Sequence, residues 1–175
     1  MGISSNPPNT NILQASKFLL SFDRLPDMTF FCTEAVLPGV SVGQAFQYTP
    51  LIDAPVPGDK MIYNPLTINF LIDEQMKAWT SILDWIKGYT FPETTEQYKN
   101  LPMQQKIQLG AVQPQYSDAS LIIYSNKNNP ILQVDFNRIF PINLTDIEFS
   151  TKKSAEDIMT ASASFMFTGY TIIRS

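Results

Sequence analysis

The chain contains no histidine and a single cysteine, Cys32, among its 175 residues. Without histidine there is no Ser-His-Asp or Cys-His nucleophile arrangement, no histidine metal ligand and no ordinary group that titrates near neutral pH. One cysteine provides neither a disulfide within the chain nor a cysteine-cluster zinc site. We therefore expect no catalytic residue, no metal and no cofactor, and we expect Cys32 to be a small residue of a strand or of the core.

Charge is also scarce, since 16% of the residues are charged and the net charge is −4. A protein that grips a phosphate backbone by charge needs a basic surface, so this mode of nucleic-acid binding is excluded. The seven glycines form no phosphate-binding loop of the GxGxxG or GxxxxGK[ST] type. No apolar run approaches the roughly 20 residues of a membrane helix, so we expect no membrane insertion.

What the sequence does contain is enough apolar residues for one folded domain. Hydrophobic residues make up 44% of the chain and aromatic residues 12%. Numerous Asn and Gln replace some of the missing charge, and they suit either a surface that meets other protein or a plain solvent-facing one. We expect a flexible docking arm, rich in Pro, Ser and Asn, at residues 1–14 and one β domain at residues 15–175.

Alternation of apolar and polar residues predicts most of this domain to be strands. The first strand, with Phe18 and Phe22 on one side, is expected to form a hairpin with the apolar run at 28–33. Further strands are expected at 44–49, 65–72, 120–125, 131–136, 138–144, 147–151 and 157–173. The strands at 120–125 and 131–136 are expected to form a clear hairpin.

Two long segments are expected to lie outside the sheets. The segment 50–64 contains several prolines, which exclude a central strand, so it is predicted to be a long surface loop or an arm. The segment 89–117 is rich in Gln and is also predicted to be a loop, longer than loops in compact domains usually are without a function.

One amphipathic helix is predicted at residues 73–87, with Asp73 as its N-cap and Gly88 as its C-cap. Its apolar stripe is expected to pack on a sheet and consists of Met76, Trp79, Ile82, Leu83 and Ile86. Trp85 lies off the centre of this stripe and is interpreted either as a boundary residue of the core or as an anchor at a subunit interface.

These elements predict a mainly β (α+β) fold in which two antiparallel sheets form a split sandwich or small barrel with one flanking α-helix. Three acidic pairs were considered for chemistry, and all stand at helix starts or in loops, where carboxylates cap and solvate: Asp73 with Glu74, Glu93 with Glu96, and Glu156 with Asp157. We therefore expect no enzyme. A host-surface or carbohydrate-binding β-sandwich module is an alternative, for which loop aromatics are available at Tyr89, Phe91, Tyr98 and Tyr116. The same aromatics are equally able to fix a long loop to its own domain.

Several segments, taken in order, carry a family resemblance. They are LPGV at 37–40; YNPLTINFLIDE at 63–74, which runs into the helix with Trp79 and Trp85; and VDF at 134–136, FPI at 140–142, IEFS at 147–150 and the strand at 161–167. This ordered set resembles the tail-tube family of contractile-tailed bacteriophages, which includes the ring proteins that join the tube to the baseplate. The resemblance covers about residues 15–172.

The resemblance implies a homohexameric ring that stacks into the inner tube of a phage tail and conducts DNA without specific binding. The partners implied are further copies of the chain, tail sheath and baseplate proteins, and the location implied is the virion, after assembly in the host cytoplasm. The alternative within the family is a tube-initiating baseplate ring, favoured by the long 89–117 segment. Contacts between subunits or rings are expected at the N-terminal arm and the 50–64 excursion, in residues Asn6, Pro7, Pro8, Pro55, Pro57, Gly58, Asp59 and Lys60.

Overall fold

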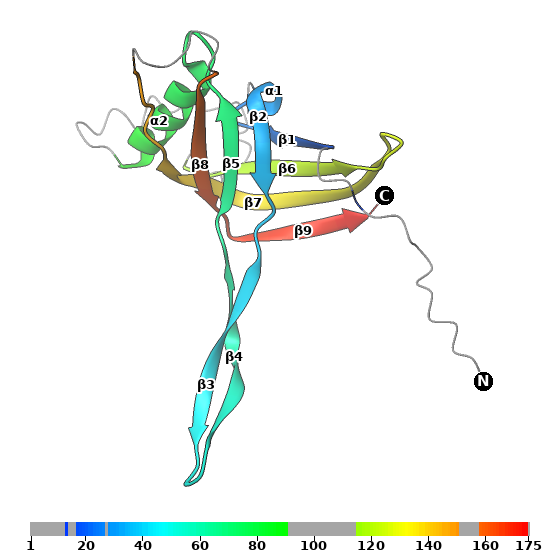
Figure 1. Cartoon of the computed structure of the whole chain (residues 1–175), viewed down its shortest axis with the longest axis vertical. Helices are drawn as coiled ribbons and strands as arrows, with labels where there is room; N and C mark the ends of the chain where they lie inside the picture. The colour runs from blue at the N-terminus through cyan, green and yellow to red at the C-terminus, as the bar shows by residue number, and fades with distance from the viewer. Residues whose placement is uncertain (1–12, 14–16, 27, 91–114, 151–157, 175) are drawn as a thin grey trace, which may run out of the picture.

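The structure is a computed structural model that describes residues 13, 17–26, 28–90, 115–150 and 158–174. The described residues form nine strands and two helices (Figure 1). In chain order these are β1 (Phe18–Phe22), α1 (Met28–Phe31), β2 (Cys32–Val36), β3 (Val40–Tyr48), β4 (Asp53–Tyr63), β5 (Leu66–Leu71), α2 (Lys77–Thr90), β6 (Ser117–Tyr124), β7 (Pro130–Leu144), β8 (Thr160–Met166) and β9 (Gly169–Arg174).

Seven of the strands form two antiparallel sheets that share β7. Sheet A has the order β1-β6-β7-β9, and sheet B has the order β2-β5-β8-β7. The two sheets run across one another in Figure 1, because β7 pairs with β6 and β9 in its first part and with β8 in its last part. The strand order ends at β1 and β2, so the sheets do not close into a barrel.

β7 changes sheets at Arg138, whose φ of 53° lies in the left-handed region. The backbone N–H of Arg138 donates to Asp118 Oδ1 at 3.0 Å, which satisfies a donor that the interrupted ladder leaves unpaired. Beyond this point Ile139 and Pro141 are buried, so the strand continues directly into the second sheet. One strand thereby belongs to both layers, as an inner strand of sheet A and as an edge strand of sheet B.

The core fills the space between the two sheets. Alternate residues of β1, β5, β6, β7 and β8 point into it, as the period-two pattern requires. The fully buried large side chains come from both sheets and from α2, and they include Leu20, Ile68, Phe70, Ile82, Trp85, Val134, Phe136 and Phe165. The predicted fold class, two antiparallel sheets with one flanking helix in a mainly β protein, is confirmed, in the open form rather than as a barrel.

The predicted hairpin between residues 17–23 and 28–33 is wrong. β1 pairs with β6, and β2 pairs with β5 in the other sheet. Between them the N–H of Met28 donates to the carbonyl of Leu25 at 3.1 Å, opening the one-turn helix α1 with Met28 buried. Burying Met28 in this turn carries the chain from one sheet to the other. Cys32 begins β2 and lies half-buried against the core, as expected for a small strand residue.

The predicted helix exists, but both of its ends differ. Asp73 does not cap it: its carbonyl accepts from the N–H of Met76 at 2.9 Å in a turn, and Met76 has a φ of 53°. The helix therefore begins at Lys77 and continues past Gly88 to Thr90. Gly88 is buried inside the helix rather than ending it, because a residue without a side chain suits the helix surface facing the core.

The buried face of α2 is also rotated from the predicted stripe. It consists of Ala78, Ile82, Trp85 and Gly88. Of the predicted stripe Ile82 is fully buried, Trp79 and Ile86 pack partly buried against the core, Leu83 is half-buried, and Met76 precedes the helix. Trp85 is a core residue with 2% of its surface exposed, neither a boundary residue nor an exposed anchor.

The later strands differ from prediction at three places, the first being that the strands expected at 131–136 and 138–144 are one strand, β7. The hairpin β6–β7 is confirmed, as is the burial of alternate residues from Ala161 to Phe167. The expected strand at 147–151 does not form over residues 147–150. The expected single closing strand is two strands, because the chain turns at Thr168, whose N–H donates to the carbonyl of Asn137 at 3.1 Å.

Candidate assembly surfaces

The segment 50–64 is mostly strand, not loop. Residues 53–63 form β4, which pairs with β3 in a separate two-stranded antiparallel sheet that projects from the body as an arm (Figure 1). We call residues 40–63 the arm. β4 has an open edge, where the missing N–H of Pro55 and Pro57 costs no ladder hydrogen bond. The argument against a central strand was therefore sound, but it did not exclude a strand of an isolated ribbon.

The base of the arm is fixed to the body by aromatic rings. The Tyr63 ring lies 5.4 Å from that of Phe167 and 5.5 Å from that of Tyr170, both centroid to centroid. The N–H of Asn64 donates to the carbonyl of Gly39 at 3.0 Å, closing the base of the ribbon. The arm therefore leaves the body in a defined direction.

The middle of the arm contains an irregularity that two glycines permit. The register shifts between the pair Val42–Met61 and the pair Gln44–Pro57, so β4 contains extra residues there. Gly58 lies so close to Gly43 that a Cβ on Gly58 would meet the Gly43 carbonyl oxygen at 2.5 Å. A Cβ on Gly43 would meet nothing within 4 Å. A side chain at position 58 would therefore collide with the backbone of β3, whereas a side chain at position 43 would not. This explains the need for glycine at position 58.

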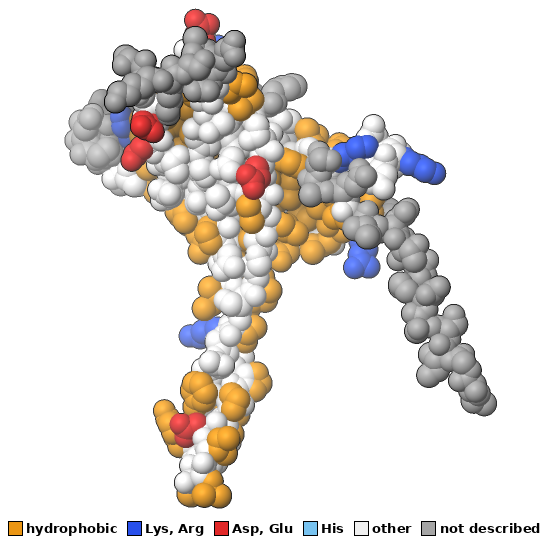
Figure 2. All heavy atoms as spheres, viewed as in Figure 1, with side chains coloured by type: hydrophobic (Ala, Val, Ile, Leu, Met, Phe, Trp, Pro, Cys, Tyr) orange, Lys and Arg blue, Asp and Glu red, His pale blue; other side chains and the backbone are white. Residues whose placement is uncertain are grey.

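The arm exposes apolar side chains along its length. Every residue of β3 is exposed, and Figure 2 shows hydrophobic atoms down the whole arm and at its tip. The tip residue Leu51 has 98% of its surface exposed. The other exposed large hydrophobic residues of the arm are Val40, Val42, Phe46, Tyr48, Ile52, Val56, Met61 and Ile62. Such a concentration marks a contact surface, because soluble monomers rarely expose contiguous apolar patches of this extent.

A second candidate surface is the outer face of sheet B, which is almost uncharged and combines Thr, Ser and Asn side chains with the apolar Val36, Leu71 and Met166. Cross-strand neighbours there pair Asn69 with Ser162 and Thr67 with Ser164, and the two hydroxyls of the latter pair lie 3.3 Å apart. Glu34 is the one charged side chain on this face of β2, β5 and β8. Asn69 Nδ2 donates to Glu34 Oε2 at 2.6 Å, so this carboxylate is held by a neutral partner.

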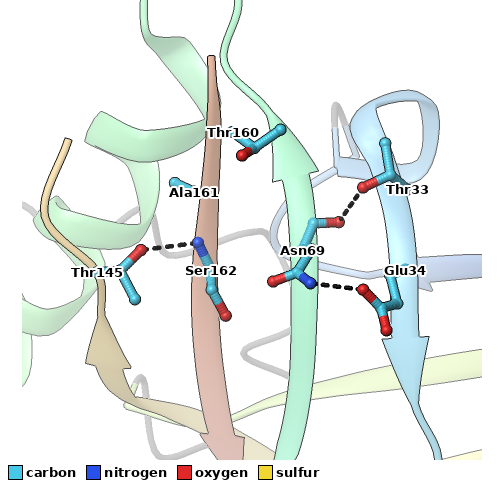
Figure 3. A pocket seen from close by; sticks show the side chains of 7 residues that line it. All are labelled: Thr33, Glu34, Asn69, Thr145, Thr160, Ala161 and Ser162. Atoms are coloured by element: carbon cyan, nitrogen blue, oxygen red, sulfur yellow. Dashed lines mark hydrogen bonds between the residues drawn. The ribbon is translucent and has the colours of Figure 1, made fainter. Parts of the chain in front are cut away.

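The polar hollow on this face is lined by hydroxyl and amide groups that bond one another (Figure 3). Thr33 Oγ1 donates to the Asn69 carbonyl at 3.1 Å, and Thr145 Oγ1 accepts from the Ser162 N–H at 2.8 Å. These hydrogen bonds join lining groups to one another, so the amide of Asn69 and the hydroxyls of Thr33 and Thr145 are already engaged within the protein. Among the described residues no group of three or more His, Cys, Asp or Glu side chains could hold a metal ion.

Two of the aromatic residues considered for sugar binding pack against their own domain. Tyr89 OH donates to the Pro141 carbonyl at 2.5 Å, and the Tyr116 ring lies 5.6 Å from that of Phe140 in an edge-to-face contact. Burial raises the pKa of Tyr89 above its usual value. Phe91 and Tyr98 lie outside the described residues. In the part of the chain that is described, no helix is both long and apolar enough to span a membrane.

The predicted contact residues are divided between two regions. Pro55, Pro57, Gly58, Asp59 and Lys60 all lie in β4, on the arm. Asn6, Pro7 and Pro8 lie outside the described residues. Sequence reasoning predicted a strand at 44–49 and an excursion at 50–64, but it did not join them into one arm and did not name Leu51 or Ile52 as contacts. The signal was available, because apolar residues recur on both sides of the proline-rich segment.

Two crossing antiparallel sheets, an apolar arm and an almost uncharged outer face define a structural β protein of the tail-tube kind. The family model described as phage tail tube protein matches residues 6–173, and this chain belongs to that family. The class that the family model defines is that of structural proteins of the phage tail tube.

One curated protein and two solved structures are similar to this chain over most of its length. The tail tube terminator protein of Enterobacteria phage T4 is 21% identical over 168 residues, which cover 94% of this chain and 82% of that protein. The cap structure described as the anti-feeding prophage tube terminating cap has a TM-score of 0.64 at 15% identity and covers 100% of both chains. A chain of the anti-feeding prophage baseplate has a TM-score of 0.64 at 7% identity, with 95% of this chain and 98% of that chain covered. These structures share the fold.

Proposed function

We propose that this protein forms a hexameric ring that ends the inner tube of a contractile phage tail. The observation that carries the position in the tail is the similarity to the T4 tail tube terminator over 94% of the chain. The chain of a tube-terminating cap also matches this chain over its whole length. A chain from a sheath/tube terminator of another contractile injection system matches 93% of this chain. The repeating tube subunit and the baseplate ring, which share the fold, are the alternatives.

A closed ring of six copies would cover edge strands that are unpaired in the single chain. β1 and β2 end the strand order, and unpaired edges are an aggregation hazard unless they are covered. Pairing the β1 and β2 edges with those of identical neighbours covers both of them when the rotation closes, and β9 remains the free edge of sheet A. The anti-feeding prophage baseplate that shares the fold is described as 6-fold symmetrised.

In this ring the outer face of sheet B lines the channel. DNA must pass a lining that presents no cations to its phosphates. The described residues of β2, β5 and β8 place hydroxyls, an amide, one carboxylate and three apolar side chains there, and no Lys or Arg. With a net charge of −4 per chain, six copies carry −24. The candidate lining residues are Glu34, Thr67, Asn69, Ser162 and Ser164.

Contacts with other subunits are made by the arm and the N-terminal segment. The arm supplies Pro55, Pro57, Gly58, Asp59 and Lys60 on β4, together with the apolar side chains of β3 and the tip. Asn6, Pro7 and Pro8 remain proposed contacts of the N-terminal segment. Tail sheath and neck or baseplate proteins are the further partners of a ring at an end of the tube, and the ring is part of the virion.

The purified protein tests the ring directly. Light scattering is expected to give a mass of about 119 kDa, six times 19.8 kDa, and negative-stain microscopy is expected to show annular particles with a central hole. A terminator stops at single rings, whereas a repeating tube subunit grows into filaments. A solitary 19.8 kDa species at high concentration overturns the ring, and a carbohydrate-binding module is then tested by retention on sugar columns.

The position along the tail needs the intact particle. Gold-labelled antibody against this chain is expected at the head-proximal end of the tube. Label along the whole tube makes it the repeating subunit, and label at the opposite end makes it the baseplate ring. Either of those results contradicts the terminator assignment while leaving the ring intact.

A further inference from the structure

The inner face of sheet A continues beyond the region that sheet B covers. In the row of partners Leu20, Leu121 and Val134 the side chains are buried, but Ile172 at the β9 edge is 48% exposed. The next row along the strands consists of half-buried apolar side chains, Phe18, Ile123 and Leu132, opposite Arg174. We call Phe18, Ile123, Leu132 and Ile172 the shelf.

Basic side chains surround the shelf. Lys17 precedes β1 and donates from Nζ to the carbonyl of Asn126, 2.9 Å away in the β6–β7 turn. Lys127 lies in the same turn, and Arg174 ends β9 opposite Leu132. In Figure 2 hydrophobic atoms lie beside the base of the arm, and Lys or Arg atoms lie farther out on the same side of the body. The shelf is therefore an apolar floor with a positively charged rim.

The tip of the arm has the complementary character. Leu51 and Ile52 are 98% and 72% exposed, and Asp53 follows them directly. The 11 residues of β4 extend about 36 Å at about 3.3 Å per residue, away from the body and from β9 (Figure 1). The tip of a paired ribbon with an anchored base does not fold back onto the shelf of its own chain.

We propose that the arm of one copy docks on the shelf of a neighbouring copy, with the Leu51–Ile52 tip on the apolar floor and Asp53 facing the basic rim. This inference rests on the proposed ring and names the surface that receives the arm. The contact is head-to-tail, because two different surfaces of the same chain meet, and six such contacts close a ring with no arm or shelf left over. Opposite charges at the two surfaces favour this pairing over arm against arm.

Mixing two assembly-defective variants tests the head-to-tail contact. Ile52→Asp disables the arm and leaves the shelf, and Ile172→Asp disables the shelf and leaves the arm. Each variant alone is expected to lose ring formation, while a 1:1 mixture forms a two-chain complex of about 40 kDa, twice 19.8 kDa, and nothing larger in analytical ultracentrifugation. Ile158→Asp is the matched control and is expected to form rings. Ile158 lies outside both surfaces and is 73% exposed, as Ile52 is at 72%.

The possible results separate this inference from the proposed function. If the unmodified protein forms hexamers but the mixture stays at 19.8 kDa, docking on the shelf is wrong and the ring stands. If Ile172→Asp alone forms rings as the unmodified protein does, docking on the shelf is again wrong. If the mixture pairs while the unmodified protein forms a ring of another size, docking stands and the hexamer is wrong.

Cross-linking identifies the occupant of the shelf in the full chain. In a Cys32→Ser background, chains with Leu51→Cys and chains with Ile172→Cys, distinguished by mass tags, are treated with a short bismaleimide. Cross-links between the two kinds of chain are expected. Cross-links between two Leu51→Cys chains overturn the proposal in favour of arm against arm. A doubly substituted chain with Asn6→Cys and Ile172→Cys that cross-links internally overturns it in favour of the chain's own N-terminal segment.

Discussion

The two tryptophans of α2 differ in environment although they lie less than two turns apart. The Trp85 ring is buried, lies 6.2 Å from the Phe165 ring and has the Arg24 guanidinium carbon 5.0 Å from its centroid. Its Nε1–H donates to the Gln115 carbonyl at 3.0 Å. Trp79 is half-buried and donates to the Thr145 carbonyl at 3.3 Å. Trp85 thus joins the helix to both sheets, and the cation above it adds a cation–π contact.

Truncating the two tryptophans is expected to give unequal losses of stability. Trp85→Ala leaves a large cavity and removes the hydrogen bond to the Gln115 carbonyl, and is expected to lower the free energy of unfolding by about 3–5 kcal/mol. Trp79→Ala removes a half-buried ring and is expected to cost about 1–2 kcal/mol. Urea denaturation followed by circular dichroism measures both. An equal or larger loss for Trp79→Ala contradicts the rotated helix face.

Cys32 is the one thiol of the chain, and the structure makes it unreactive. Burial, together with the nearby Glu34 carboxylate, raises the pKa of the Cys32 thiol to about 11, and a backbone hydrogen bond at Glu34 opposes this rise. Because the folded pKa lies above the ordinary value, the protonated thiol is favoured in the folded state. Its stabilising contribution is complete below about pH 9 and is lost as the pH rises through about 11.

Alkylation of Cys32 by iodoacetamide at pH 8 is therefore expected to be about 100-fold slower in the folded protein than in the unfolded chain, since the thiolate is the nucleophile. Mass spectrometry of timed aliquots, with and without denaturant, measures the ratio. Equal alkylation rates in the two conditions would show that the Cys32 thiol is not buried and that its pKa is not raised.

At the scale of elements, the arm depends on one close backbone contact. A two-stranded ribbon is only marginally stable in water, so a local disruption in its middle separates the tip from the anchored base. The contact at Gly58 and the open space at Gly43 allow that disruption to be made without touching the core.

Gly58→Ala is expected to open the distal half of the arm, because its Cβ would meet the Gly43 carbonyl at 2.5 Å and carbonyl carbon at 2.9 Å, and both are backbone atoms. Hydrogen exchange is expected to lose protection in the arm amides from residues 44–57, with the core amides unchanged. Gly43→Ala is the matched control and is expected to retain protection, because its Cβ meets nothing within 4 Å. Equal exchange in the two variants contradicts the close approach.

At the scale of the whole molecule, the distribution of charge matters more than its total. The outer face of sheet B is almost free of charge, whereas basic groups gather at the far end of sheet A. In the proposed ring the uncharged face surrounds DNA, which carries a dense negative charge. Cations added to that face and cations added elsewhere should therefore differ in effect although they change the net charge equally.

Asn69→Lys combined with Ser162→Lys adds twelve positive charges to the channel of a six-membered ring. Purified rings of this variant are expected to retain duplex DNA at low salt and release it as salt rises, because the contacts are to phosphates. The control is Asn137→Lys with Thr171→Lys, which adds the same charge at exposed positions of sheet A. If the control retains DNA as strongly, or the channel variant retains none, sheet B does not line the channel.

Prediction from the sequence succeeded where a local pattern is decisive. Alternation gave β5 and β8 with their buried faces, and the turn at 126–130 gave the β6–β7 hairpin. It failed where long-range contacts decide. Nothing local distinguishes a hairpin at 17–33 from two strands in different sheets, and the choice follows from the burial of Met28. The segment 50–64 was predicted to be a loop or an arm but not a strand. Its prolines exclude a central strand of a sheet, but they do not exclude a strand of a two-stranded ribbon.

The sequence by itself determined the class of protein: no histidine, one cysteine and few charges remove most chemistry, and period-two alternation specifies antiparallel sheets. The tertiary structure alone decided how β7 joins the two sheets at Arg138, which face of α2 is buried, and that the segment 50–64 belongs to an exposed apolar arm. The physical reason is that side-chain alternation is encoded by neighbours along the chain, whereas strand partners and helix rotation depend on apolar surface buried between distant segments.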